Sequence, residues 1–254
     1  RNILVKDTAM VTLIDTDSFQ VFSSAGMFRC LVGVPEFTPP ELIGKSFAQV
    51  DRSVESDNFS LAVLIFKLLM EGVHPFDGLY QGAGDPPPLE DRISRGDYPH
   101  SGNPCQIKPR PHALVLDVLH AEIRQMFHQC FAEGHRLPSQ RPTAARWKEA
   151  LEKAAHELAV CQVNVQHYYG HHLQNCPWCE RRTRFGNLGH HDPFPSESDV
   201  RAGRHLIRPS VAPPPSPPQP VPSSSSASSA GVKPQPVRRV KSWKRFAWVP
   251  VILI

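Results

Sequence analysis

The most regular hydrophobic pattern in the chain lies in the stretch SLAVLIFKLLME, from Ser60 to Glu71. Its apolar residues recur at the i, i+3, i+4, i+7, i+8 spacing of a helix, namely Leu61, Leu64, Ile65, Leu68 and Leu69. Further apolar side chains cover most of the other faces, which predicts a helix buried nearly all round. We expect Asp57 to cap this helix at its N-terminus and Gly72 to end it. About twelve residues are too few to cross a bilayer, so the pattern predicts the central helix of a folded domain.

Weaker patterns surround this central helix. Two short apolar runs, residues 2–5 and 10–14, flank turn residues and predict a β-hairpin. Pro39 and Pro40 favour the start of a short helix. Three further helices are expected over residues 89–95, residues 113–130 and, behind a Thr143 cap, residues 144 to about 160. The patterns therefore predict a mainly α domain with a short β-hairpin.

A segment rich in His, Cys and Arg begins at Cys161. The chain has 6 cysteines, and only the last three, Cys161, Cys176 and Cys179, cluster in the sequence. This distribution argues against a disulfide framework and for a reducing compartment with one metal site. Cys176 and Cys179 form a C-x-x-C knuckle, and Cys161 and His167 upstream complete a Cys3His set. Such a tetrahedral set of sulfur and nitrogen ligands is typical of structural Zn²⁺.

Alternatives to this ligand set stay open. His171 and His172 are further nitrogen donors in the same segment. The C-x-x-C pair is also typical of redox sites, but those need a thioredoxin-like βαβ pattern, which the sequence lacks. Cysteines that bind no metal at all are the remaining alternative.

The C-terminal part of the chain changes composition twice. Many of the 27 prolines stand among serines in the low-complexity tract of residues 209–229. Such a tract cannot bury enough apolar surface to fold, so we expect a disordered, extended linker over residues 187–237. A cluster of basic residues follows, and then the uncharged run FAWVPVILI at residues 246–254.

This apolar run predicts the start of a transmembrane helix that the sequence cuts short. It is shorter than the roughly twenty residues that a span needs. The basic cluster before it, Arg238, Arg239, Lys241, Lys244 and Arg245, marks the cytoplasmic side of a membrane. We therefore expect a cytoplasmic domain anchored to the inner or plasma membrane. A strand or tail packed on the domain is the alternative.

Charge patterning bears on the partners of the chain. The net charge of +4 is small, and the basic residues are mostly interleaved with acids, which disfavours nucleic acid as a partner. Arg181, Arg182 and Arg184 in the Cys/His segment keep a nucleic-acid-associated role open, and its sign would be salt-dependent retention on DNA.

A series of short motifs precedes the Cys/His segment. Residues 1–5, RNILV, match the end of the catalytic-loop pattern H-R-D-x-x-x-x-N. Asp15, Thr16 and Asp17 stand where D-F-G follows that loop. Residues 33–42, GVPEFTPPEL, match a substrate-binding loop that runs into A-P-E, here Pro39-Pro40-Glu41.

Later motifs continue the series in the same order. Asp57 opens the long buried helix, residues 71–78, EGVHPFDG, form the loop after it, and Arg141 is followed by proline. Together the motifs resemble the C-terminal lobe of eukaryotic-like protein kinases over residues 1–158. More narrowly, IDTDSFQV at residues 14–21 and the Cys/His segment resemble a bacterial group that joins a kinase-like domain to a helix-hairpin-helix or cysteine-rich region.

The resemblance implies a protein serine/threonine kinase that transfers a phosphoryl group from Mg-ATP to a hydroxyl of a protein substrate. Asn2 and Asp15 would hold Mg²⁺ through an amide and a carboxylate oxygen, and Asp17 would offer a second carboxylate. Without the later motifs, Asn2 would be interpreted as a turn residue and Asp15 as a turn cap.

The same resemblance assigns scaffold roles to other residues. Glu41 and Arg141 are expected to form a buried bidentate ion pair. Asp57 is expected to accept hydrogen bonds from the backbone of the catalytic loop. Asp17 departs from the family, which has glycine there, and Thr16 replaces the usual phenylalanine. These departures keep open a pseudokinase scaffold that binds partners and transfers no phosphate.

The sequence contains no glycine-rich phosphate loop, β3 lysine or catalytic-loop aspartate. We therefore expect a C-lobe fragment without its N-lobe, inactive by itself. The sequence then divides into four parts: a kinase-like C-lobe fragment (1–158), a zinc-knuckle segment (159–186), a Pro/Ser-rich linker (187–237), and the basic cluster with the start of a membrane span (238–254).

Overall fold

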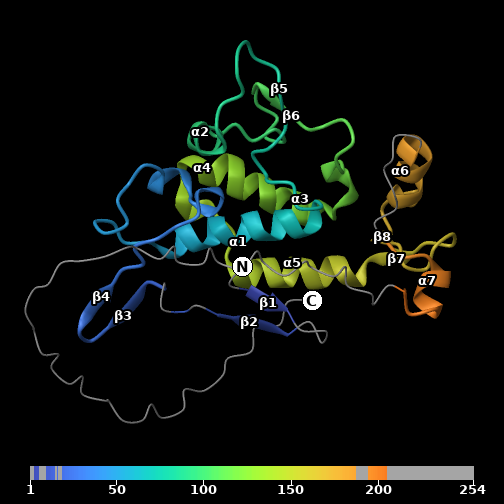
Figure 1. Cartoon of the computed structure of the whole chain (residues 1–254), viewed down its shortest axis with the longest axis horizontal. Helices are drawn as coiled ribbons and strands as arrows, with labels where there is room; N and C mark the ends of the chain where they lie inside the picture. The colour runs from blue at the N-terminus through green and yellow to red at the C-terminus, as the bar shows by residue number, and fades with distance from the viewer. Residues whose placement is uncertain (1–2, 6–9, 15, 17–18, 187–193, 205–254) are drawn as a thin grey trace, which may run out of the picture.

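The structure is a computed structural model that describes residues 3–5, 10–14, 16, 19–186 and 194–204 (Figure 1). The described part is mainly helical, with short antiparallel hairpins. Its helices are α1 (Val54–Leu69), α2 (Leu89–Arg95), α3 (Ala121–His128), α4 (Gly134–Arg136), α5 (Ala144–His156), α6 (Pro177–Phe185) and α7 (Glu197–Arg201). A π-helical turn, η5 (Gln129–Glu133), joins α3 to α4. The 3-10 turns are η2 (Pro35–Phe37), η3 (Pro40–Leu42), η4 (Leu116–Val118) and η6 (Pro138–Gln140).

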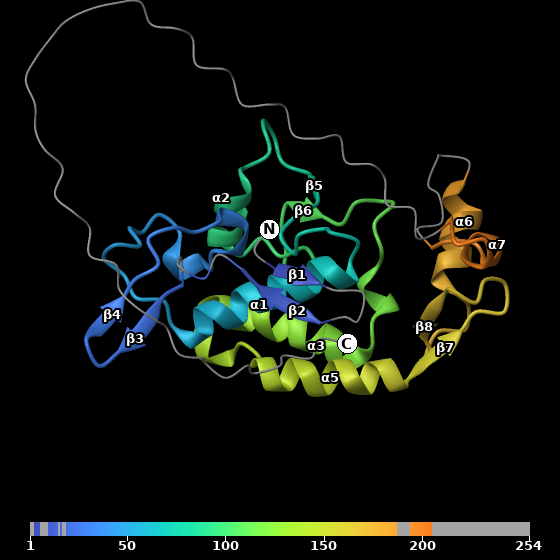
Figure 2. The same cartoon turned by 60° about the horizontal axis from the view of Figure 1, so that its bottom comes forward.

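The strands form separate two-stranded sheets. The pairs are β1 (Ile3–Val5) with β2 (Val11–Leu13), β3 (Val21–Ser23) with β4 (Gly26–Phe28), β5 (Leu79–Tyr80) with β6 (Ile107–Lys108), and β7 (Leu158–Val160) with β8 (Tyr168–Gly170). Figure 2 shows β3 and β4 at one end of the molecule and β7, β8, α6 and α7 at the other end, beyond the last turn of α5.

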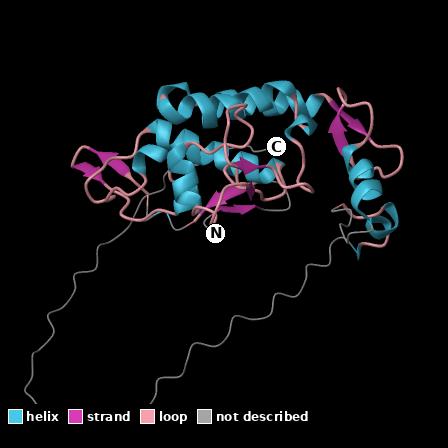
Figure 3. Ribbon diagram, turned by 90° about the horizontal axis from the view of Figure 1, so that it is seen from above, coloured by secondary structure: helices cyan, strands magenta, loops and turns pink. Residues whose placement is uncertain are grey.

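The core is built around α1, and α3, η5 and α5 contribute to it (Figures 1 and 3). Phe59 and Phe66 of α1 are buried together with Phe127 of α3 and Phe131 of η5. The rings of Phe59 and Phe131 meet edge to face with centroids 5.7 Å apart, and those of Phe66 and Phe127 with centroids 4.9 Å apart. The ring centroid of Trp147 in α5 also lies 4.9 Å from that of Phe127. Aromatic pairs in such geometries add to the gain from burial, so this cluster holds the helices together.

The central helix is confirmed, but its start and its buried face were predicted wrongly. α1 begins at Val54, and Ser53 caps it by accepting a hydrogen bond from the amide of Ser56 at 3.3 Å. Asp57 is therefore not the cap but a residue of the first turn. The stripe of apolar residues that the sequence predicted as buried includes Leu68, whereas the side chain of Leu68 is 69% exposed. The buried apolar face consists of Phe59, Ala62, Val63, Ile65 and Phe66.

The other predicted elements differ mainly at their ends. The hairpin β1–β2 and helix α2 occur where they were predicted. The helix expected over residues 113–130 begins only at Ala121, because the residues before it form η4 and an extended stretch. Thr143 caps α5 as expected, but α5 ends at His156, because Leu158–Val160 pair with β8 instead of continuing the helix.

The predicted tail falls largely outside the described residues. Within residues 187–237 the structure describes helix α7, capped by Ser196, where the sequence predicted a disordered linker. Residues 238–254, with the predicted start of a membrane span, lie outside the described part. Among the described residues, no helix has the length and apolar character that a membrane crossing needs.

Candidate functional site

Glu41 and Arg141, which the motif series paired, lie at the start of α1. Arg141 Nη1 donates to Glu41 Oε1 at 2.7 Å and its Nη2 donates to Oε2 at 2.8 Å, which makes the pair bidentate. The side chain of Arg141 is fully buried, whereas that of Glu41 is 31% exposed. Arg141 also donates to the carbonyls of Glu55 and Gly134, each at 2.9 Å. One guanidinium therefore ties η3 to the first turn of α1 and to α4.

Opposing effects set the charge of Glu41. Its partial burial raises the pKa of its carboxyl group. Hydrogen bonds from Arg141 and from its own backbone amide, together with the charge of Arg141, outweigh this burial and hold the pKa below the ordinary value. Glu41 is therefore ionised at neutral pH, and its ion pair with Arg141 has a structural role.

The predicted Mg²⁺ ligands Asn2, Asp15 and Asp17 lie outside the described residues. Asp57 is described, in the first turn of α1. Loss of hydration raises the pKa of Asp57, and the nearby charge of Arg52 opposes this rise. Within the described part of the chain its carboxylate has no hydrogen-bond partner, so its expected bonds to the catalytic-loop backbone stay a prediction.

The predicted metal ligands converge at the far end of α5. One ligand atom from each of Cys161, His167, Cys176 and Cys179 lies within 4.8 Å of all the others. Cys161 directly follows β7, His167 directly precedes β8, Cys176 caps α6, and Cys179 lies in the first turn of α6. His167 is fully buried, and its Nδ1 lies 3.5 Å from the sulfur of Cys176 and 3.6 Å from that of Cys179. This donor set fits a tetrahedral Zn²⁺ site.

Asn164, which the sequence analysis did not single out, orients the ring of His167. Its side-chain amide lies 3.2 Å from Nε2 of His167. The Oδ1 of Asn164 accepts a hydrogen bond from the amide of Gln166 at 3.1 Å, which fixes this side chain in the turn before β8. Nδ1 of His167 consequently faces the sulfurs. An Nδ1 that binds a metal leaves the ring proton on Nε2, which then needs an acceptor, so the Nδ2 contact of Asn164 fixes the position of the ring and does not select the metal-binding tautomer. A polar residue close before His167 was the available signal.

The thiols of the cluster differ in acidity. Burial raises the pKa of Cys161, but the backbone N–H groups of Asn164 and Val163 and the neighbouring thiols outweigh it, and the pKa falls to about 6. Burial and the sulfur of Cys161 raise the pKa of Cys176. Burial and the other two sulfurs raise the pKa of Cys179 to about 12. The backbone N–H groups near Cys161 therefore favour a thiolate there, and a bound cation would stabilise thiolates at the cluster.

The alternative ligands His171 and His172 have other partners. Nδ1 of His171 lies 2.9 Å from the carbonyl oxygen of Glu157, and Nε2 of His172 lies 3.2 Å from that of Asp117. Neither histidine belongs to the described ligand cluster. The geometry therefore favours His167 as the nitrogen ligand.

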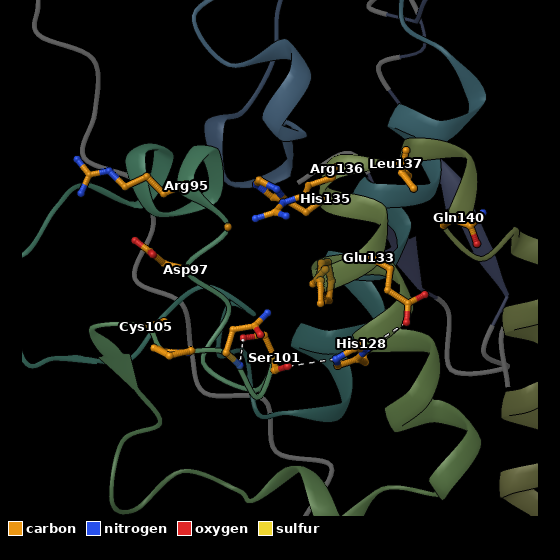
Figure 4. A pocket seen from close by; sticks show the side chains of 15 residues that line it. Arg95, Asp97, Ser101, Cys105, His128, Glu133, His135, Arg136, Leu137 and Gln140 are labelled. Carbon is orange, nitrogen blue, oxygen red and sulfur yellow. Dashed lines mark hydrogen bonds and ion pairs between the residues drawn. The ribbon is translucent and has the colours of Figure 1, made fainter.

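A pocket of about 760 Å³ opens between the end of α2, the loop of residues 101–105 and the segment from η5 to α4 (Figure 4). His135 bridges one side by contacting the carbonyl of Ile93 at 2.8 Å, and His128 bridges the other by contacting that of Ser101 at 3.2 Å. Charged lining residues of both signs include Arg95, Asp97, Glu133 and Arg136. No sequence motif links these residues, so the pocket could not be predicted from the sequence. Its mixed charge suits a polyanion such as nucleic acid poorly.

Comparison with known proteins connects the chain to a kinase. It is 39% identical over 181 residues to Protein kinase YegI of Escherichia coli O157:H7, and equally to that of Escherichia coli strain K12. The match covers 69% of this chain, and the chain spans 28% of the length of these curated relatives. No protein-family model matches the chain. The similarity supports a kinase-like relationship for the matched part.

Proposed function

We propose that the full-length protein is a protein serine/threonine kinase, to which this chain contributes the C-terminal lobe of residues 1–158. It would transfer a phosphoryl group from Mg-ATP to a hydroxyl of a protein substrate. The bidentate pair of Arg141 and Glu41 carries the proposal, because it joins the A-P-E-like loop to the helical core, as the motif series demands. The identity of 39% to Protein kinase YegI supports the same assignment.

In this proposal Asn2 and Asp15 hold Mg²⁺, and Asp17 offers a further carboxylate. Mg²⁺ held there would neutralise charge on the phosphates of ATP, from which the transferred group would come. Glu41 and Arg141 fix the loop that would receive the protein substrate. A pseudokinase scaffold is the second candidate function, because Asp17 and Thr16 replace residues that the kinase motif has.

Phosphate transfer by the full-length protein distinguishes these candidates. With labelled ATP and Mg²⁺, the wild type should label itself, and Asp15→Asn should abolish the labelling because it removes the charge that holds the ion. Asp85→Asn removes a charge from an exposed loop position and should label like the wild type. Equal labelling of wild type and Asp15→Asn would favour the scaffold.

The segment of residues 159–186 is proposed to hold a structural Zn²⁺ through Cys161, His167, Cys176 and Cys179. The convergence of these ligand atoms within 4.8 Å supports this assignment. The preceding hairpin, β7–β8, is antiparallel, whereas a thioredoxin-like redox site would need a βαβ unit. Bound zinc would tie the start of α6 to this hairpin.

The remaining residues are proposed to form a tether and a membrane anchor. The Pro/Ser-rich composition of residues 209–229, beyond helix α7, supports a linker, and the basic cluster before residues 246–254 supports attachment to the inner or plasma membrane. After fractionation of cells that express the full-length protein, we expect it in the membrane pellet and its release by detergent. Recovery in the supernatant without detergent would exclude the anchor.

A further inference from the structure

Helix α6 carries the proposed metal ligands Cys176 and Cys179 at its start. Its later residues contact the kinase-like part of the chain, residues 1–158, called the kinase-like body below. Arg181 Nη1 donates to Glu71 Oε1 at 2.7 Å, and its Nη2 donates to the carbonyl of His112 at 3.2 Å. The ring of Phe185, at the end of α6, meets the ring of His112 edge to face with centroids 4.7 Å apart. The helix is therefore docked on the turn after α1 and on the loop of residues 109–118.

This loop closes the core over the C-terminal end of α1. Leu114 of the loop is 4% exposed and belongs to the same core cluster as Met70. The metal-binding segment contacts the loop on both sides of Leu114. Arg181 binds the carbonyl of His112, and Nε2 of His172 lies 3.2 Å from the carbonyl of Asp117. The position of Leu114 over α1 is thus braced from outside by this segment.

Glu71 needs such a brace because its backbone is strained. It has φ of 54°, and no other non-glycine residue in the described part of the chain has a positive φ. A left-handed backbone is uncommon for a residue with a Cβ and persists where its surroundings hold it. The side chains of Glu71 and Arg181 are 35% and 23% exposed, and the 2.7 Å contact between them holds this turn from the side of α6.

The position of α6 depends in turn on the metal ligands. Cys176 caps the helix and Cys179 lies in its first turn, whereas Cys161 and His167 belong to the hairpin. An ion bound to all of them would fix the helix start relative to the hairpin. α6 has 9 residues, and a helix shorter than about 12–15 residues is marginal in water without packing partners.

We propose that metal binding docks α6 on the Glu71 turn and on the loop of residues 109–118, so that the bound ion controls closure of the core at the end of α1. The inference rests on the proposed zinc site and goes beyond it, because its effect lies in the kinase-like body. Removal of the metal should free α6, uncover Leu114 and loosen the turn at Glu71.

Hydrogen–deuterium exchange of the whole chain tests this, with bound zinc measured by elemental analysis in the same samples. Removal of zinc by a chelator should raise the exchange rates of amides in residues 109–118 about ten-fold, while amides of α3 keep their protection. If zinc is bound and its removal leaves residues 109–118 unchanged, the docking inference is wrong and the zinc site stands. If no zinc is bound, both are wrong.

Arg181→Gln separates docking from metal binding. It removes the charged contact with Glu71 and no ligand atom, so the zinc content should stay as in the wild type. The exchange of residues 109–118 should nevertheless rise about ten-fold with zinc present. Arg182→Gln is the matched control, because this neighbouring side chain has no partner among the described residues, and it should exchange like the wild type. Equal exchange in wild type and both variants would overturn the proposal.

Discussion

Arg141 and Glu41 lie 100 positions apart in the sequence and are joined by hydrogen bonds of 2.7 and 2.8 Å. The guanidinium is fully buried, and its charge is balanced by this carboxylate, by the backbone carbonyls of Gly134 and Glu55 and by the face of the Phe59 ring, 5.3 Å away. Removal of one partner of a buried pair typically costs about 3–5 kcal/mol, because the other charge stays buried without compensation. The pair therefore makes the loop before α1 and the segment after α4 one structural unit.

We expect Glu41→Gln to lower the free energy of unfolding by about 3 kcal/mol. The effect should fall at the lower end of the range because Glu41 is 31% exposed. Glutamine keeps the shape of the side chain, so the change reports the lost charge. Urea denaturation at neutral pH measures it. Glu149→Gln, at an exposed position of α5, is the control and should change the free energy by less than about 0.5 kcal/mol. Equal effects of both variants would contradict the prediction.

The same pair predicts a loss of stability in acid. The pKa of Glu41 in the folded protein lies below its ordinary value of 4.5. As the pH falls, the unfolded chain therefore binds this proton before the folded protein does. The contribution of Glu41 is complete above that ordinary value and is lost as the pH falls through the folded pKa. The stability difference between wild type and Glu41→Gln should shrink below about pH 4.5. A constant difference in urea titrations down to the acid limit would refute this.

The sequence predicted elements well where local chemistry decides them. The Thr143 cap and the helical turn that begins at Pro40 are both present. The buried face of α1 could not be predicted as well, because leucines and phenylalanines each form a helical stripe. The contacts of Phe127 and Phe131 with Phe66 and Phe59 decide that the phenylalanine-bearing face of α1 is buried. Phe131 itself lies in a π-helical turn, η5, which the spacing of apolar residues does not predict.

In the candidate site, too, features set by local sequence could be predicted and features set by tertiary packing could not. The candidate metal ligands that the structure brings together could be named because the C-x-x-C spacing of Cys176 and Cys179 is itself the signal. Arg181 could not be placed, because its partner Glu71 lies 110 positions away and the contact depends on how α6 docks. In the sequence Arg181 was one of several arginines in a basic stretch. Tertiary packing alone distinguishes it from Arg182.

Zinc content and affinity test the metal centre. Purified without chelators, the chain should carry about one zinc ion per molecule. Asn164→Ala should weaken zinc binding about 10- to 100-fold, because it frees the ring of His167 from its amide contact. Competition with a chromophoric chelator measures the affinity. Gln174→Ala, at an exposed position of the loop before Cys176, is the matched control and should bind like the wild type. Identical affinities of the two variants would show that Asn164 has no part in the site.

The structure holds His74, in the turn after α1, as a neutral imidazole. Its Nδ1 accepts from the amide of Phe76 at 3.2 Å, so the ring proton is on Nε2, which donates to the carbonyl of Glu36 at 2.8 Å. Burial lowers the pKa of His74 below its ordinary value of 6.5. The bond to Glu36 and the carboxylates of Glu36 and Asp77 oppose this lowering, and the charge of Lys67 adds to it.

Acidification should therefore cost stability through His74. Below the ordinary pKa of 6.5 the unfolded chain binds a proton that the folded protein does not, so the free energy of unfolding falls as the pH drops towards the folded pKa. This single group contributes a slope of at most about 1.4 kcal/mol per pH unit. In His74→Gln the amide can donate to Glu36 and accept from Phe76 without titrating, so urea denaturation between about pH 7.5 and 5 should show a shallower decline than in the wild type. His156→Gln, at the exposed end of α5, is the matched control and should follow the wild type. If His74→Gln declines in parallel with both, the buried imidazole is not a source of the acid lability.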